Sequence, residues 1–280
     1  MTQLPIDTKV KSIHDVFMDS QAFVVPEYQR SYQWGHSQIQ NLVRDIHLSV
    51  CSIAQSSSLN HEIRFLGSII TIVQNAGLMQ HHYGSLQPNV FHEIVDGQQR
   101  LTTFALLASV LHHMVRDAYV DLTKAEYTPA IIDKLKHVVD RYEKQLAVVY
   151  AYKLQQMTKD FVLPAIIRAE NDRWEDNKGS FRSQVARLLH QHIHPSNESS
   201  KSAHRGGDIV VKNVLAMRQL LTQHSMGGFP TIDDDNEEPL FYQPYDVVIR
   251  LNAFLWHGNY NDLSAAVLHD SVHQDTPLLR

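Results

Sequence analysis

The sequence predicts an α+β fold, with a small sheet in the first half of the chain and helices over most of the second half. Stretches rich in β-branched and aromatic residues at positions 22–26, 63–73 and 90–95 indicate strands. Between and after them, apolar residues recur every three or four positions, which is the spacing of an amphipathic helix. The length of 280 residues allows one large domain or two small ones.

In the first half, the elements are expected to alternate. A helix over residues 11–19 precedes the first strand, and a second helix over residues 38–52 follows it. Residues 63–73 form a nearly continuous apolar run, the pattern of a strand that is covered on both faces. Residues 75–88 contain two glycines and a proline, so they are expected to form a loop or hairpin before the third strand.

The third strand leads through a polar turn into a helix that is expected to begin near Leu101. A helix amino terminus suits phosphate, because its first N–H groups lack partners and carry the positive end of the helix dipole. Gly97 allows a ligand to approach the backbone, and Arg100 offers a guanidinium that fits two phosphate oxygens. Asp96 can hold a Mg²⁺ ion or orient a water.

A helix cap is the simpler interpretation of the same turn. Asp96 followed by Gln99 fits a capping box, which does no more than start a helix. Capping does not explain why Gln98, Gln99 and Arg100 stand together in one tight turn. Both interpretations therefore stay open at this point.

The second half is expected to be mainly helical. Residues 130–157 predict one long or kinked helix, and residues 161–164 predict an extended segment. A polar run follows, in which Arg168 and Arg173 are candidates to line the same pocket as the turn at Gly97. An acidic stretch at 227–239 is interpreted as a solvated loop. Further helical segments are expected at residues 181–192, 208–224, 242–254 and 263–272.

Composition limits the class of protein. A formal net charge of −5 argues against a grip on DNA by the whole surface, although a local basic groove is compatible with it. No apolar run is long enough to span a bilayer, so no membrane association is expected. Cys51 is the single cysteine, and no signal peptide precedes the first helix, which together predict a cytoplasmic protein.

Three stretches carry a resemblance to a known family. Residues 96–103 read DGQQRLTT, residues 25–34 read VPEYQRSYQW and residues 65–70 read FLGSII. In this order they resemble the DGQQR motif, the first motif (I/V)PxYQRxYxW and the following strand of the GmrSD-type restriction endonuclease N-terminal domain family, a relative of the ParB/sulfiredoxin fold. The similarity runs from about residue 23 to about residue 189.

The resemblance implies a fold and its division. It implies a ParB/sulfiredoxin-like small mixed sheet with helices, followed by a mainly helical region. The expected boundary separates a DGQQR nucleotide-binding domain, residues 1–125, from a mainly helical region, residues 126–280.

The resemblance also implies a nucleoside triphosphate with Mg²⁺ as the ligand. The catalytic residues would be Asp96, Gln98, Gln99 and Arg100, with Asp96 as the metal ligand. The nucleotide-binding residues would be Gln29, Arg30, Tyr32, Trp34, Gly97, Arg100, Thr102 and Thr103.

The function implied is that of an NTP-binding and hydrolysing domain in a bacterial anti-phage, DNA-modification-dependent restriction system, with hydrolysis coupled to DNA cleavage. Implied partners are modified DNA, an HNH nuclease domain or subunit, and a second copy in a homodimer. Three alternatives stay open: a nucleotide-switched DNA-binding module without turnover, a DNA-nicking domain, and a scaffold in which DGQQR only starts a helix.

Overall fold

The computed structural model describes residues 8–20, 22–55, 65–75, 82–124, 129–155, 159–175, 181–195 and 208–225. Its helices are α1 (Ile13–Ser20), α2 (His36–Gln55), α3 (Gln98–Lys124), α4 (Pro129–Tyr150), α5 (Gln184–Ile193) and α6 (Ile209–Ser225). Its strands are β1 (Phe23–Val25), β2 (Ile70–Asn75), β3 (Val90–Asp96), β4 (Ala151–Gln155), β5 (Asp160–Pro164) and β6 (Ile166–Arg168). This content confirms the α+β prediction. The helices expected at 242–254 and 263–272 and the acidic stretch at 227–239 lie outside the described residues.

The main sheet is small and mixed, in the order β2-β3-β1-β6. β1 runs parallel to both β3 and β6, whereas β2 pairs antiparallel with β3. The carboxyl ends of the three parallel strands therefore meet at one edge, and the segment that enters β2 lies at the same edge, because Ile70 pairs with Asp96. We call this the carboxyl edge; its residues are 26–30 after β1, 66–69 before β2, 96–97 after β3, and Arg168.

β2 corrects one prediction. The apolar run at 63–73 indicated a strand covered on both faces, and this was wrong, because β2 is the outermost strand of the sheet. The side chains of Ile70, Ile72 and Val73 are 52%, 51% and 62% exposed. A continuous apolar run arises in a buried parallel strand, but apolar composition alone does not tell a central strand from an edge strand.

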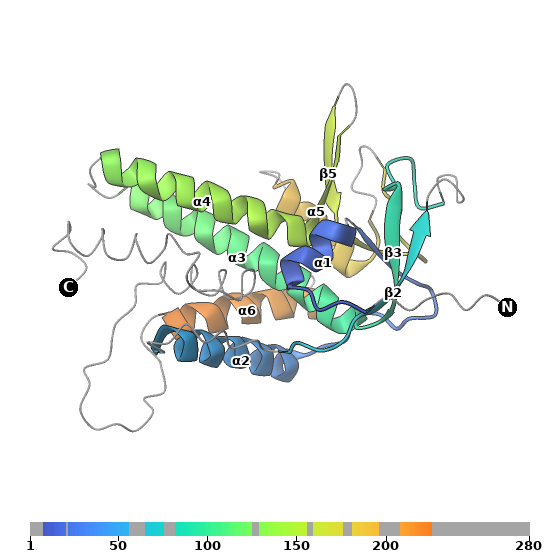
Figure 1. The fold of residues 1–280 in the computed structure, drawn as a ribbon, viewed down its shortest axis with the longest axis horizontal. Helices are drawn as coiled ribbons and strands as arrows, with labels where there is room; N and C mark the ends of the chain where they lie inside the picture. Colours follow the sequence, from blue (N-terminus) through green and yellow to red (C-terminus); the bar gives the residue numbers. More distant parts are fainter. Residues whose placement is uncertain are drawn as a thin grey trace.

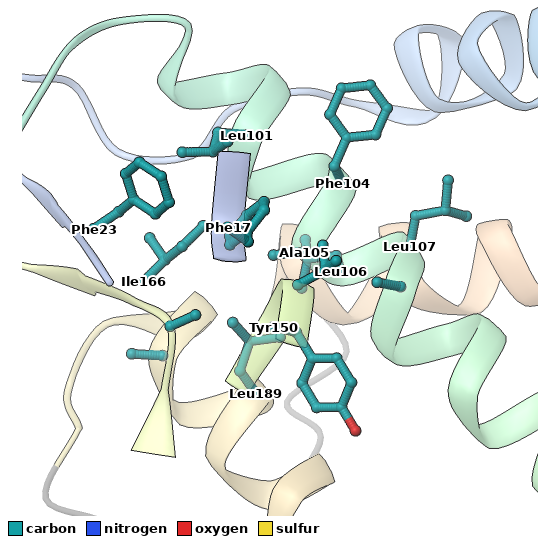
Figure 2. Close-up of a cluster of buried hydrophobic side chains, with 14 of the residues drawn as sticks. Phe17, Phe23, Leu101, Phe104, Ala105, Leu106, Leu107, Tyr150, Ile166 and Leu189 are labelled. Atoms are coloured by element: carbon teal, nitrogen blue, oxygen red, sulfur yellow. The ribbon is translucent and has the colours of Figure 1, made fainter. Parts of the chain in front are cut away.

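α3 is the central helix of the molecule. Every residue from Leu101 to Leu111 is buried, so this part of the helix is covered on all sides. Figure 1 shows α4 running alongside α3, with α6 and α2 together on another side. The core cluster joins α3 to the sheet, α1, α4 and α5 (Figure 2), through residues that include Phe17, Phe23, Leu101, Phe104, Leu106, Tyr150, Ile166 and Leu189.

Two helix boundaries differ from the prediction. α3 begins at Gln98 rather than near Leu101, so the turn residues Gln98, Gln99 and Arg100 form its first turn. The helix predicted over 130–157 ends at Tyr150, and the chain continues as β4, which pairs antiparallel with β5. Within β4, apolar Tyr152 and Leu154 alternate with polar residues, which is a strand period that the longer helical pattern masked.

The second half of the chain also contributes to the main sheet. β6 pairs with β1, so a strand from beyond residue 126 completes the sheet begun by the first half. α4 packs along α3, and α6 packs beside α2. The boundary at 125/126 stays a prediction, and the two halves that it separates share one core.

Candidate functional site

The carboxyl edge brings the sequence motifs together. The first motif follows β1, the DGQQR turn follows β3, and the stretch Leu66–Ile69 precedes β2. In the strand order, the chain passes from β1 toward β2 on one side and from β3 toward β6 on the other side, so the direction of the connections reverses between β3 and β1. In open sheets with parallel strands, ligands bind outside the carboxyl ends at such a switch point. The topology therefore selects this edge as the candidate site.

Gly97 starts α3 in a left-handed conformation. Its φ is +88°, and its carbonyl accepts the first helical hydrogen bond, from the Leu101 N–H at 2.9 Å. The space beside its Cα is occupied by the chain itself, because a Cβ there would lie 3.0 Å from the Ser68 carbonyl oxygen and from Ile69 Cγ1. Gly97 is therefore required for the turn and for its packing against the segment that enters β2.

The Arg100 guanidinium lies across a second glycine. Gly67 has a φ of +104°, and a Cβ at this residue would overlap Arg100 Nη1. Nη1 donates to the Leu66 carbonyl oxygen at 3.4 Å, and Nη2 lies 4.0 Å from Asp96 Oδ2. The Arg100 side chain is 28% exposed and that of Asp96 is 60% exposed. Arg100 is thus held in place by backbone and a distant carboxylate, and part of its charge still faces solvent.

The Gln99 side chain fastens the first motif to the helix start. Its Oε1 accepts from the Gln33 N–H at 2.8 Å and the Trp34 N–H at 3.2 Å. Its Nε2 donates to the Ser31 carbonyl oxygen at 3.1 Å and to Gln98 Oε1 at 3.0 Å. Gln99 therefore does not form a capping box, because its side-chain amide is bonded to the backbone of residues 31–34.

Gln29 makes a second connection between the same two segments. Its Nε2 donates to the Val95 carbonyl oxygen at 2.8 Å, at the end of β3. Arg30 lies between Gln29, which is bonded to the end of β3, and Ser31, which is bonded to Gln99 of α3. The backbone at Arg30 is therefore fixed near the turn, while its side chain is exposed.

The other predicted nucleotide ligands lie inside the fold. Thr102 and Thr103 are 1% and 0% exposed, and Tyr32 is 7% exposed. The Tyr32 hydroxyl is 2.9 Å from Thr103 Oγ1, which donates to the Gln99 carbonyl oxygen at 2.7 Å. Burial raises the pKa of the Tyr32 phenol. These residues therefore lie in the core next to the candidate site, where Tyr32 and Thr103 are joined by hydrogen bonds to the first turn of α3.

Trp34 is half-buried against the core. Asn213 of α6 is 2% exposed, and its Nδ2 donates to the Trp34 carbonyl oxygen at 2.5 Å and to the Tyr32 hydroxyl at 3.4 Å. The first motif is therefore held from two sides, by Gln99 of α3 and by Asn213 of α6. Asn213 was not among the predicted site residues, and a single polar residue in a helical pattern gives no signal that would identify it.

Asp96 is the candidate metal ligand at the edge. Within the described ranges, no group of three or more histidine, cysteine, aspartate or glutamate side chains is placed to hold a metal ion. A Mg²⁺ ion that arrives with a nucleotide requires less, because it keeps several waters and takes its other ligands from phosphate oxygens. The exposed Asp96 carboxylate fits this reduced requirement.

At the end of β6 and in the polar run that follows lie Arg168 and Arg173, the two arginines that were predicted to line one pocket. Arg168 Nη2 donates to the Gln29 carbonyl oxygen at 2.7 Å, so it reaches the carboxyl edge, while the prediction that it lines a pocket stays a prediction. Arg173 instead donates to the carbonyl oxygens of Ala169 and Asp172 and lies 5.9 Å from the Tyr83 ring centroid. Arg168 and Arg173 therefore do different things, and only the first bonds to a motif of the site.

Comparison with protein families finds a match over most of the chain. The family described as GmrSD restriction endonuclease, N-terminal domain, matches residues 13–240. This range includes every part of the carboxyl edge and all the described helices and strands. None of the curated proteins matches the chain. As to membranes, none of the helices in the described parts of the chain combines the length and the apolar character that crossing a bilayer requires.

Proposed function

The chain belongs to the family of GmrSD restriction endonuclease N-terminal domains, and on this premise we propose that it binds and hydrolyses a nucleoside triphosphate with Mg²⁺. Restriction endonucleases act on DNA, so we propose modified DNA as the substrate of the system to which the domain belongs. In this proposal the domain acts in bacterial defence against phage and couples hydrolysis to DNA cleavage by an HNH nuclease domain or subunit.

One observation supports the nucleotide most strongly. The first turn of α3 opens at the carboxyl edge, where three parallel strands end, and Arg100 stands in that turn with part of its charge exposed. Unpaired helix N–H groups and a guanidinium together favour an anion of high charge. Arg30, also exposed, is held beside the same turn by its neighbours Gln29 and Ser31.

The proposed roles follow from position. Arg100 and Arg30 neutralise phosphate oxygens, and Asp96 helps to hold the Mg²⁺ ion that accompanies them. Phosphoryl transfer depends mainly on positioning and on stabilising charge, which these groups can supply. When bound, the ion would supply positive charge that stabilises the charge developing on the phosphates, with Asp96 as the residue that would help to hold it. Gln98 is the remaining candidate to orient a water, since both ends of the Gln99 amide are engaged.

A second function has an observation of its own in its favour. Gln98, the remaining candidate to orient a water, is 6% exposed, and its Oε1 accepts a hydrogen bond from Gln99, so it is poorly placed for that role. This arrangement favours a nucleotide-dependent switch without turnover. The bonds from Gln99 to residues 31–34 would then pass nucleotide occupancy to the first motif and, through Asn213, to α6.

Two measurements on the full chain separate these functions. Thermal denaturation with ATP, GTP, CTP or UTP and Mg²⁺ tests binding, because a ligand at about 100 times its Kd stabilises the fold by about 2.7 kcal/mol. Release of inorganic phosphate tests hydrolysis. Arg100→Ala should abolish both responses, whereas Arg44→Ala, at an exposed position on α2, should keep them.

Stabilisation with phosphate release supports the hydrolase, and stabilisation without release supports the switch. If no nucleotide stabilises the wild-type chain, the nucleotide proposal is overturned. If Arg100→Ala releases phosphate at the wild-type rate, the assignment of the site to the first turn of α3 is overturned.

A further inference from the structure

Arg168 connects the last strand of the sheet to the first motif. Its side chain is 15% exposed, and Nη2 donates to the Gln29 carbonyl oxygen at 2.7 Å across 139 residues of sequence. Its Nε donates to the exposed Glu170 carboxylate at 3.2 Å. A hydrogen bond from a guanidinium is about twice as strong as one between neutral groups. The hydrogen bond from Arg168 therefore restrains the position of the backbone at Gln29.

Asp172 makes the base of Arg168 rigid. The Asp172 side chain is fully buried, and its carboxylate accepts from the N–H groups of Arg168 at 2.9 Å, Arg182 at 2.8 Å and Ser183 at 2.9 Å. The Ser183 hydroxyl donates to it as well. A buried carboxylate is tolerated only when such donors surround it. The end of β6 is consequently anchored to the start of α5.

Gln29 extends this connection to β3. Its carbonyl oxygen accepts from Arg168, and its side-chain amide donates to the Val95 carbonyl oxygen at 2.8 Å. The carboxyl ends of β6, β1 and β3 are thus joined across the edge by two side chains, Arg168 and Gln29. Arg30 is the next residue along the chain from this junction. The direction in which Arg30 leaves the backbone therefore depends on the contact that Arg168 makes.

We propose that Arg168 is a positioning residue of the nucleotide site. It holds the backbone at Gln29, and through it Arg30, in the orientation that meets the phosphates bound at the first turn of α3. This inference rests on the proposed function and adds to it a residue from the second half of the chain. It predicts that loss of Arg168 weakens nucleotide binding and raises KM more than it lowers kcat, because the groups assigned to the chemistry, Asp96 and Arg100, are untouched.

The test uses the full chain with four variants. Arg168→Ala removes the contact to Gln29, and Arg168→Lys keeps a donor that can restore part of it. Arg182→Ala removes the same charge from an exposed side chain whose backbone N–H still serves Asp172. Glu170→Ala removes the other partner of Arg168 and leaves the Gln29 contact. Kd is measured by calorimetry with each of the four common NTPs and Mg²⁺, and hydrogen exchange is measured over residues 28–34.

Arg168→Ala should weaken nucleotide binding about tenfold, the lower range expected for a hydrogen bond to a charged group, and should speed exchange at residues 28–34. Arg168→Lys should recover part of the loss, and the other two variants should bind like the wild type. Wild-type affinity in Arg168→Ala overturns the inference while the proposed function stands. If the wild type binds no nucleotide, the proposed function fails. Unchanged exchange at residues 28–34 in Arg168→Ala would show, independently of nucleotide, that Arg168 does not hold the backbone at Gln29.

Discussion

The polar side chains at the two ends of the buried part of α3 differ in charge and in exposure to solvent. At the first turn, Gln99 uses its whole amide to bind the first motif, and Arg100 keeps a charge that is partly in contact with solvent. Eleven residues of buried helix follow, Leu101 to Leu111. At their far end, His112 of α3 contacts α4 and His113 of α3 contacts α5, and burial favours the neutral form of each ring.

At this histidine end of the buried segment, His112 contacts two side chains of α4. The Tyr150 hydroxyl lies 2.7 Å from His112 Nδ1, and Glu143 lies 3.9 Å from His112 Nε2. Burial, with smaller contributions from His113 and Arg116, lowers the pKa of His112 to about 4. Burial also lowers the pKa of His113, against the opposing effect of Asp117, and its ring lies 4.6 Å from that of His192.

One helix, α3, thus carries the candidate site at its first turn and purely structural residues further along. The first turn exposes charge and takes its hydrogen bonds from distant loops, so it can respond to a ligand. The histidine rings pack among helices and are held in their neutral form by burial, so they are part of the packing of the fold rather than of a charged site. Changes at the buried middle and the histidine end should therefore alter stability, and changes at the first turn should alter binding.

The largest effect is expected in the buried middle of α3. Leu106 is fully buried, and Leu106→Ala should lower the free energy of unfolding by about 2–5 kcal/mol through lost burial and a residual cavity. Leu215→Ala, at a position 60% exposed on α6, should change it by less than about 0.5 kcal/mol. Urea denaturation measures both. Equal costs for the two variants would contradict the central place of α3 in the core.

The pH dependence of stability should expose the histidine end. A folded-state pKa below the unfolded value of 6.5 means that the unfolded chain binds more protons between pH 6.5 and about 4. The free energy of unfolding should thus fall as the pH falls through this window, with about 3 kcal/mol from His112 by pH 4. His112→Asn should flatten the dependence relative to His137→Asn, an exposed control on α4. Parallel profiles for the two variants would contradict this account.

Gly67 offers a way to disturb the first turn while keeping Arg100. In Gly67→Ala, the new Cβ would occupy the place of the guanidinium, and a φ of +104° is unfavourable for alanine. We expect a loss of about 1–3 kcal/mol of stability and weaker nucleotide binding, measured by calorimetry with Mg²⁺. Gly35→Ala is the control, since its Cβ would meet only Gln38 Oε1 at 3.6 Å. Equal nucleotide affinity in the two variants would show that the place of Arg100 does not matter.

The smallest effect concerns the support behind the site. Tyr32→Phe removes the hydroxyl that lies between Thr103 and Asn213, which should cost about 1 kcal/mol. Tyr28→Phe changes the same atom on a side chain that is 71% exposed, and it should cost nothing measurable. Thermal denaturation without ligand compares them. Indistinguishable melting temperatures would remove the hydroxyl from the account of how the first motif is held.

Much of the fold was predictable from local patterns. β1, β3, α2, α5 and α6 were expected within a few residues of their observed bounds, because each has a clear period and a clear break. β2 and the end of α4 were misread for a physical reason. Edge strands and hairpins take their place from partners distant in sequence, and neither apolar content nor helical spacing carries that information.

For the candidate site, the meeting of the two motifs was predictable, whereas most of their contacts were not. The DGQQR turn and the first motif do meet, and the helix does begin at the turn. The sequence could not show that the side-chain amides of Gln29 and Gln99 form hydrogen bonds with backbone groups 65 or more residues away. Nor could it show that the side chains of Tyr32, Thr102 and Thr103 are buried. Such pairings depend on strand order, which residue types do not reveal.

The central claim is that a nucleoside triphosphate binds where the first turn of α3 meets the carboxyl edge. Hydrogen exchange of the wild-type chain, with and without Mg²⁺ and the NTP that stabilises it most, locates the bound phosphates directly. The account predicts slower exchange at the N–H groups of Gln98, Gln99 and Arg100 and over residues 29–31. Protection confined to other segments, or none at all under saturating nucleotide, would contradict it.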